Sequence, residues 1–250
     1  MGKTPNRIGT ENSKSDGSLC IIPARGNSKR FPQKNIALLC GKPLLVYSIE
    51  VAIESCIFET ICVSSENEEI LSIAESYGVE ALKRPTDLST DHIGYNQVCL
   101  HVLEHLIHHG VRYASFAVLL PTSPLRAAVD IREAYDILRQ KDVDYVMSLI
   151  PYSYPPLRAV WVPNRYVEPY FESKYIEMKQ SQLFDTLYRH DGTIIFAKTE
   201  VFLKEKEFYG TKVAPYFTPA ERAVDIDNPM DLAWAEFLLS YLSKNSTYAS

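Results

Sequence analysis

The sequence predicts an α/β fold, a mostly parallel sheet with helices on both faces. The first observation is that short apolar, strand-like segments alternate with segments of helical periodicity. The second is that polar or basic loops follow the strand-like segments. Ligands in such sheets bind beyond the carboxyl ends of the strands, so those loops are the candidate site. The predicted strands are Ser18–Pro23, Thr60–Ser64, Tyr113–Leu120 and Tyr145–Ile150, and the predicted helices are Pro43–Ser55, Glu68–Tyr77, Gln97–His108 and Val129–Arg139.

Composition restricts the class of protein. A chain of 250 residues that is 46% hydrophobic can bury the core of one large domain or two small ones. A net charge of −5 gives no general attraction to nucleic acid, and no apolar stretch is long enough to span a membrane. Five scattered cysteines indicate reduced thiols. We expect a cytoplasmic protein that binds neither nucleic acid nor membrane, with a disordered tail over residues 1–17 and one domain over residues 18–250.

A basic loop follows the first predicted strand. It runs from Ala24 to Gln33, and Lys34 and Asn35 follow at once. Backbone N–H groups around Gly26, two small polar side chains and several cations can together replace the water that a phosphate group loses on binding. A solvated basic turn is the alternative interpretation, but the strand–loop–helix setting favours phosphate. The cations are Arg25, Lys29, Arg30 and Lys34, and the small polar residues are Asn27 and Ser28.

Two aspartates precede the last predicted helix, which runs from about Pro229 to Leu242. If Asp225 and Asp227 are extended, their side chains project to the same side of the chain. Two carboxylates on one side can hold Mg²⁺, which prefers a few carboxylates together with substrate phosphates. The alternative is that Asp227 or Asn228 caps the helix and that Asp225 lies on the surface. Beside a phosphate loop, the metal interpretation gains support.

A proline-fixed loop follows the third predicted strand. In Pro121–Arg126, the hydroxyls of Thr122 and Ser123 and the cation of Arg126 either contact a ligand or cap the next helix. Arg84, which follows a short strand, is a further cation able to reach the same edge of the sheet.

The alternation stops between Pro151 and about His190, a proline- and tyrosine-rich stretch. It predicts an extended excursion, either a partner-binding arm or a flap over the site. A regular strand, Thr193–Lys198, follows it.

Taken together, these motifs resemble the acylneuraminate cytidylyltransferase family, the synthetases that make CMP-sialic acid and related CMP-nonulosonates. The resemblance covers essentially Ser18 to Leu242, and several motifs in the same order make it specific. The motifs are Ile21–Lys29 with Lys34–Asn35, Gly41–Leu44, Arg84–Pro85, Pro121–Arg126 and Asp225–Asp227.

The resemblance implies a Rossmann-like nucleotidyltransferase fold and a Mg²⁺-dependent reaction of CTP with a 2-keto sugar acid. Asp225 and Asp227 would hold the metal and, with Arg25, Lys29 and Lys34, form the catalytic set. Displacement at the α-phosphate depends mainly on positioning and on neutralising charge, which agrees with this assignment. The phosphates would contact Arg25, Asn27, Ser28, Lys29 and Lys34, with Asn35 and Arg84 completing the nucleotide site and Ile93 and Tyr95 in the cytosine-recognition stretch.

Departures from the family's pattern lie mostly on the sugar side. Leu120 stands where the family usually has a glutamine that touches the sugar, and Ser181–Asp185 lacks the family's arginine before Gln182. The base stretch, usually hydroxyl-rich, reads Ile93–Gly94–Tyr95. Arg158 is the candidate for the substrate carboxylate because its guanidinium can bind one bidentately. The implied sugar set is Leu120, Thr122, Ser123, Arg126, Arg158 and Gln182.

The sequence therefore predicts a cytidylyltransferase that activates a sialic-, legionaminic- or pseudaminic-type acid for surface polysaccharide or flagellar glycosylation. The resemblance also implies a homodimer in which the excursion over residues 152–190 closes the partner's site. One alternative is a synthetase for a shorter 3-deoxy-octulosonate, and another is a nucleotide-binding module without turnover.

Overall fold

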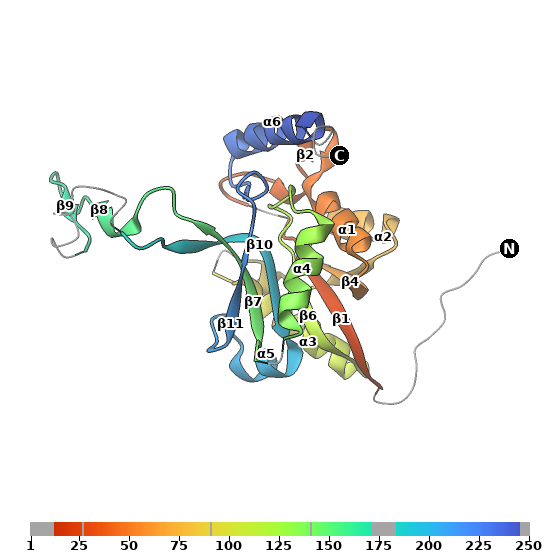
Figure 1. Cartoon of the computed structure of the whole chain (residues 1–250). Coiled ribbons are helices and arrows are strands. Elements are labelled where there is room, and N and C mark those ends of the chain that lie inside the picture. The colour runs from red at the N-terminus through yellow and green to blue at the C-terminus, as the bar shows by residue number, and fades with distance from the viewer. Residues whose placement is uncertain (1–12, 27, 91, 141, 172–183, 246–250) are drawn as a thin grey trace.

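The computed structural model describes residues 13–26, 28–90, 92–140, 142–171 and 184–245. Its centre is a seven-stranded sheet in the order β11-β7-β10-β6-β1-β4-β5 (Figure 1). β10 is antiparallel to both of its neighbours, and every other pair is parallel. The mostly parallel sheet is therefore confirmed. The strands are β1 Ser13–Pro23, β4 Phe58–Ser65, β5 Glu80–Lys83, β6 Val111–Val118, β7 Tyr145–Pro151, β10 Tyr188–Lys198 and β11 Val213–Phe217.

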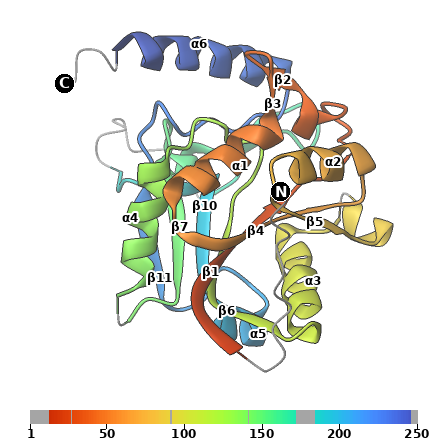
Figure 2. The same ribbon diagram turned by 90° about the vertical axis from the view of Figure 1, so that its right-hand side faces the viewer.

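Helices cover both faces of the sheet. One core joins α1 (Leu44–Ser55), α2 (Glu68–Ser76) and α4 (Ala128–Leu138) to one face. A second core joins α3 (Tyr95–His108) and α5 (Thr199–Glu205) to the other face. The last helix, α6 (Pro229–Asn245), lies across the end of the sheet near β2 and β3 (Figure 2). The short elements are β2 Leu38–Leu39, β3 Lys42–Pro43 and the 3₁₀ turns Lys34–Ile36, Thr86–Ser89 and Pro156–Arg158.

The central strand shows why the apolar runs predicted the sheet. In β1, Cys20 and Ile22 are buried in the first core, and Leu19 and Ile21 are buried in the second. A strand buried on both faces is apolar at every position, so it appears in the sequence as an uninterrupted apolar run.

The structure corrects the predicted tail and adds two elements. β1 begins at Ser13, inside the stretch 1–17 expected to be disordered, because Ser13 to Ser15 pair with the backbone of β6. The sequence did not predict α5 or β11. Pro215 lies inside β11, which is tolerated because β11 is an edge strand and one side of it needs no partner.

The excursion projects from the body of the molecule as an arm (Figure 1). Within it, the two-residue strands β8 (Val160–Trp161) and β9 (Glu168–Pro169) form a small antiparallel ladder. Large apolar side chains along the arm are exposed, among them Tyr154, Trp161 and Tyr170. The extended character predicted for this stretch is confirmed over the described residues, and residues 172–183 lie outside them.

A buried carboxylate fixes α4 against β11. Asp130 is fully buried and accepts hydrogen bonds from the Arg222 guanidinium at 2.6 and 3.0 Å and from the Tyr216 hydroxyl at 2.6 Å. It also accepts a hydrogen bond from the Ala127 N–H at the start of the helix.

Asp130→Asn would replace a fully buried carboxylate and leave the partly exposed Arg222 without its charged partner. We expect the free energy of unfolding to fall by about 3 kcal/mol, as for other broken buried pairs. Urea denaturation followed by circular dichroism measures it. Asp136→Asn, on the exposed side of the same helix, is the matched control. Equal stability of the two variants would contradict the role given to Asp130.

Candidate functional site

The predicted site residues come mainly from loops at one end of the sheet. They follow the carboxyl ends of β1, β5 and β6 and include the segment between β11 and α6, and the structure adds residues that follow β4 and lie in the antiparallel β10. Figure 2 shows α6 across this end of the molecule. It is the end at which ligands bind in open α/β sheets.

The basic loop is held against the start of α2. The Gly26 N–H donates to Glu66 Oε1 at 2.7 Å, and a Cβ at Gly26 would lie 2.8 Å from the Cβ of Asn67, so only glycine fits there. The Asn67 side chain in turn caps α2. The Gly26 N–H is therefore occupied by a carboxylate, and the expectation that N–H groups around Gly26 bind a phosphate stays a prediction for the other N–H groups of the loop.

Glu66 also binds Arg84. The guanidinium donates to Glu66 Oε2 at 3.1 Å, to the Ser64 carbonyl at 3.1 Å and to the Ser89 hydroxyl at 2.8 Å. Burial alone would raise the pKa of Glu66, but hydrogen bonds from Ser89 and Gly26 and the charge of Arg84 outweigh burial and lower it. Arg84 is itself buried. In this structure the Arg84 guanidinium is engaged by Glu66, Ser64 and Ser89, and its expected role in the nucleotide site stays a prediction.

Asp227 connects the segment before α6 to the basic loop after β1. Lys34 Nζ donates to its Oδ1 at 2.8 Å, and the Arg30 guanidinium lies 2.9 Å from its Oδ2. Burial would raise the pKa of Asp227, but the hydrogen bond and charge of Lys34, with those of Arg30, lower it. The helix cap is formed by Asn228, whose side chain accepts from the N–H groups of Met230 and Asp231. The Asp227 carboxylate therefore does not serve as a cap.

Asp225 lies beside the proline-fixed loop. Val224 and Ile226 are buried while Asp225 is exposed, which confirms the alternation predicted for this segment. The Ile226 N–H donates to the Thr122 carbonyl at 2.8 Å. The pKa of Asp225 is raised, mainly because the surrounding protein desolvates its carboxylate and further because of the charge of Asp227. A hydrogen bond with Thr122 and the charges of Lys34 and Arg189 lower the pKa but do not outweigh these effects.

Leu120 and Ser123 lie close to Asp225 around a glycine of β10. A Cβ placed on Gly192 would be 3.4 Å from Leu120 Cδ1, 3.4 Å from Ser123 Oγ and 4.0 Å from the Asp225 carboxyl carbon. Gly192 has φ +78°, a conformation that favours glycine. Ser123 Oγ is buried and has no hydrogen-bond partner within the described ranges.

Arg126 does not face this space. Its side chain is buried, and its guanidinium donates to the carbonyls of Thr193 and Leu120 and to the Ser48 hydroxyl. Burial lowers its pKa to about 10. These bonds tie the Leu120 loop to β10 and α1, and the expectation that Arg126 contacts a sugar stays a prediction.

The remaining predicted residues lie in several places. Asn35 is buried and donates to the Arg25 carbonyl at 2.8 Å, which fixes the loop that also carries Ser28 and Lys29. Tyr95 begins α3 with its ring 5.4 Å from that of Phe208 in the second core, and Ile93 precedes it by two residues. Arg158 lies on the arm over the Phe184 ring. Asn27 and Gln182 lie outside the described residues.

Sequence reasoning missed Glu66 and Gly192 and gave Arg30 no specific partner. Glu66 follows β4 at the same edge as Arg84, so charge complementarity at neighbouring strand ends was the available signal. Gly192 precedes the predicted strand Thr193–Lys198, but its proximity to Asp225 depends on the antiparallel register of β10, which the sequence does not reveal.

Comparison with known proteins decides the family. A sequence model described as cytidylyltransferase matches residues 19–238. The chain belongs to the cytidylyltransferase family. It is 32% identical over 222 residues to the pseudaminic acid cytidylyltransferase of Campylobacter jejuni, covering 88% of this chain and 95% of that protein. It is also 32% identical over 226 residues to the CMP-N,N'-diacetyllegionaminic acid synthase of Legionella pneumophila, with the same coverage.

Solved structures agree on the fold of this cytidylyltransferase. CMP:2-keto-3-deoxy-manno-octonic acid synthetase superimposes with a TM-score of 0.66 over 90% of this chain and 99% of that chain. The two sequences are 16% identical, so this likeness supports the nucleotidyltransferase fold alone. None of the described helices has the length and apolar character needed to cross a membrane.

Glu66→Gln would remove the charge that faces the buried Arg84. We expect a loss of about 3 kcal/mol in unfolding free energy near pH 7. The pKa of Glu66 is lower in the folded state than in the unfolded state. Its contribution to stability is therefore complete above the pKa of the unfolded state and is lost as the pH falls through the pKa of the folded state. The difference from wild type should therefore shrink on acidification below about pH 4. Urea unfolding across pH, with exposed Glu69→Gln as control, measures it; a pH-independent difference would contradict this assignment.

Proposed function

We propose that the chain transfers CMP from CTP to the anomeric hydroxyl of a nonulosonic acid and releases pyrophosphate. The observation that carries the proposal is the contact between the basic loop, through Lys34 and Arg30, and Asp227, with Asp225 two residues away. The names of the related synthases support the substrate class. In this reaction the anomeric hydroxyl releases its proton to water and its oxygen bonds to the α-phosphorus, the α–β phosphoanhydride bond breaks, and the electron pair leaves with pyrophosphate.

The donor set fits Mg²⁺. Asp225 and Asp227 offer carboxylate oxygens, and no group of three or more His, Cys, Asp or Glu side chains able to hold a metal occurs among the described residues. One or two carboxylates completed by substrate phosphates is the arrangement that Mg²⁺ prefers. Bound there, the ion would neutralise charge on the triphosphate and on the departing pyrophosphate. Asp227 would then exchange its contacts with Lys34 and Arg30 for the metal, which leaves both cations for phosphate oxygens.

The sugar side of the proposed site is less polar than a site built for N-acetylneuraminate. Leu120 places a methyl group beside Gly192 and Asp225 where an amide would otherwise bind a sugar hydroxyl or acyl group. Ser123 Oγ supplies an unpartnered polar atom next to it, within the described residues. We therefore favour a sugar acid of the pseudaminic or legionaminic type over N-acetylneuraminate.

The arm supports a homodimer in which each arm reaches the partner's site. Its exposed side chains include Tyr154, Val162, Tyr166 and Tyr170, a density of apolar groups that is costly to leave in water. Arg158 at its base would then meet a substrate carboxylate of the partner's site. Sedimentation equilibrium tests the dimer; a monomer at all concentrations would contradict it.

Pyrophosphate release with CTP, Mg²⁺ and a panel of nonulosonic and 3-deoxy-octulosonic acids tests the function. We expect release with pseudaminic- or legionaminic-type acids. Binding of CTP without release from any acid would contradict the enzyme assignment. Fastest release with N-acetylneuraminate would contradict the interpretation of Leu120 alone.

Asp227→Asn should lower turnover by at least about 100-fold, because an amide neither neutralises nor holds a metal as a carboxylate does. Thermal unfolding should change little, since Asp227 is partly exposed and Asn228 forms the helix cap. Steady-state kinetics in saturating Mg²⁺ measure the effect. Turnover within a few-fold of wild type would show that this carboxylate has no catalytic role.

A further inference from the structure

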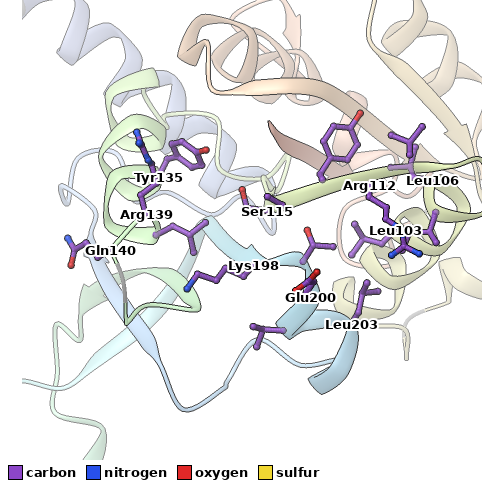
Figure 3. Close-up of a pocket in the computed structure, with 17 residues that line it drawn as sticks. Leu103, Leu106, Arg112, Ser115, Tyr135, Arg139, Gln140, Lys198, Glu200 and Leu203 are labelled. Carbon is purple, nitrogen blue, oxygen red and sulfur yellow. The ribbon is translucent and has the colours of Figure 1, made fainter. Parts of the chain in front are cut away.

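A cavity of about 610 Å³ lies at the end of the sheet opposite the aspartates. It is formed by α3, the first residues of β6, the end of α4 and the junction of β10 with α5 (Figure 3). Its volume is in the range that small ligands and short peptide segments fill. None of the residues that form the proposed catalytic site lines it.

The cavity faces the edge of β6. All five residues from 111 to 115 line it, although successive side chains of a strand point to opposite faces. It is also lined by Leu103 of α3, on one face of the sheet, and by Leu138 of α4, on the other. A space that contacts both faces and every consecutive residue must lie beside the strand.

The strand pairing explains why this edge is open. The pairing of β10 with β6 ends at Lys198, opposite Ser115, and the chain then turns into α5. β6 extends four residues further, to Val111, where β1 supplies its pairing on the other side. On the side that β10 occupies further along, residues 111–114 thus have no strand partner among the described residues, although β1 pairs with their other side. Four residues of open edge span about 13 Å.

An open strand edge with apolar pockets on both sides is suited to an extended peptide. The unpaired N–H and C=O groups are a template for an added strand, and pockets on the two faces accept alternate side chains. Leu103 and Leu106 form the wall on the α3 side, and Leu138 lies on the α4 side. Thr199 Oγ1 is buried in the lining with no hydrogen-bond partner among the described residues, which leaves one polar atom for an occupant.

The charges around the cavity along residues 111–114 of β6, called the slot below, favour an acidic occupant. Arg112 and Arg139 lie on opposite sides of Ser115 (Figure 3), and within the described ranges neither guanidinium has an ion-pair partner. Lys198 adds a third cation, which lies 3.1 Å from Asp144, and Glu200 is the one carboxylate among the described lining residues. Basic side chains on opposite sides of an open edge complement acidic residues of a short added strand.

We propose that this slot binds an extended, acidic peptide segment of another protein as an added strand along residues 111–114 of β6. The proposal does not depend on the proposed function.

Three capped synthetic peptides test it on the full chain: Glu-Val-Thr-Val-Glu, the same peptide with lysines for glutamates, and a version with proline for the central threonine. Hydrogen–deuterium exchange over residues 111–115 and calorimetric affinity are the readouts. We expect the acidic peptide alone to bind and slow exchange, because lysines repel the slot and proline lacks the N–H that pairs with the edge.

The double variant Arg112→Ala/Arg139→Ala should weaken binding of the acidic peptide at least tenfold and leave pyrophosphate release unchanged. Arg132→Ala, an exposed arginine of α4 outside the slot, is the control. Equal binding of all three peptides, or no slowed exchange at millimolar peptide, would overturn the proposal. A variant that lacks residues 1–12 gives a further test in the absence of peptide. Faster exchange over residues 111–115 in that variant would also overturn the proposal, because it would show that residues 1–12 of the chain itself fill the slot.

Discussion

Lys34 and Asp227 are 193 positions apart in the chain, and a 2.8 Å hydrogen bond joins their side chains. This contact brings the loop after β1 to the segment before α6 and keeps the two charged parts of the site together. The surroundings serve the same arrangement. Ile226 is buried and its N–H binds the Thr122 carbonyl, so Asp225 and Asp227 project from a fixed backbone. A site for a highly charged substrate needs such preorganisation, because its groups are then not reoriented when the charge arrives.

Buried polar groups fix the loops around that contact. Glu66 holds both Arg84 and the Gly26 N–H beneath the basic loop, and Arg126 holds the Leu120 loop through two backbone carbonyls. Both arginines are buried and fix backbone geometry, whereas the side chain of Arg30 is largely exposed and that of Lys34 is partly exposed. The cations that fix the loops are therefore distinct from the cations that are available to bind a phosphate.

The sequence predicted features whose cause is local. β1 was predicted because a strand buried on both faces is uniformly apolar, and the aspartate pair because extended chain alternates. What it did not predict depends on distant partners. Arg84 and Arg126 appear in the sequence as cations near strand ends, and only Glu66 and the Thr193 carbonyl make them structural. β11 contains Pro215 and is fixed by pairing with β7, a contact that no local pattern reveals.

We propose that Asp227 neutralises Lys34 and Arg30 until a metal–nucleotide complex replaces those contacts. Calorimetric titration of CTP into wild type and Asp227→Asn, each with and without Mg²⁺, tests it most directly. Without metal, the variant should bind CTP roughly tenfold more tightly than wild type, because two cations are released from a carboxylate. Adding Mg²⁺ should then improve its affinity far less than that of wild type. Equal metal-free affinity together with an undiminished gain from Mg²⁺ would contradict the account.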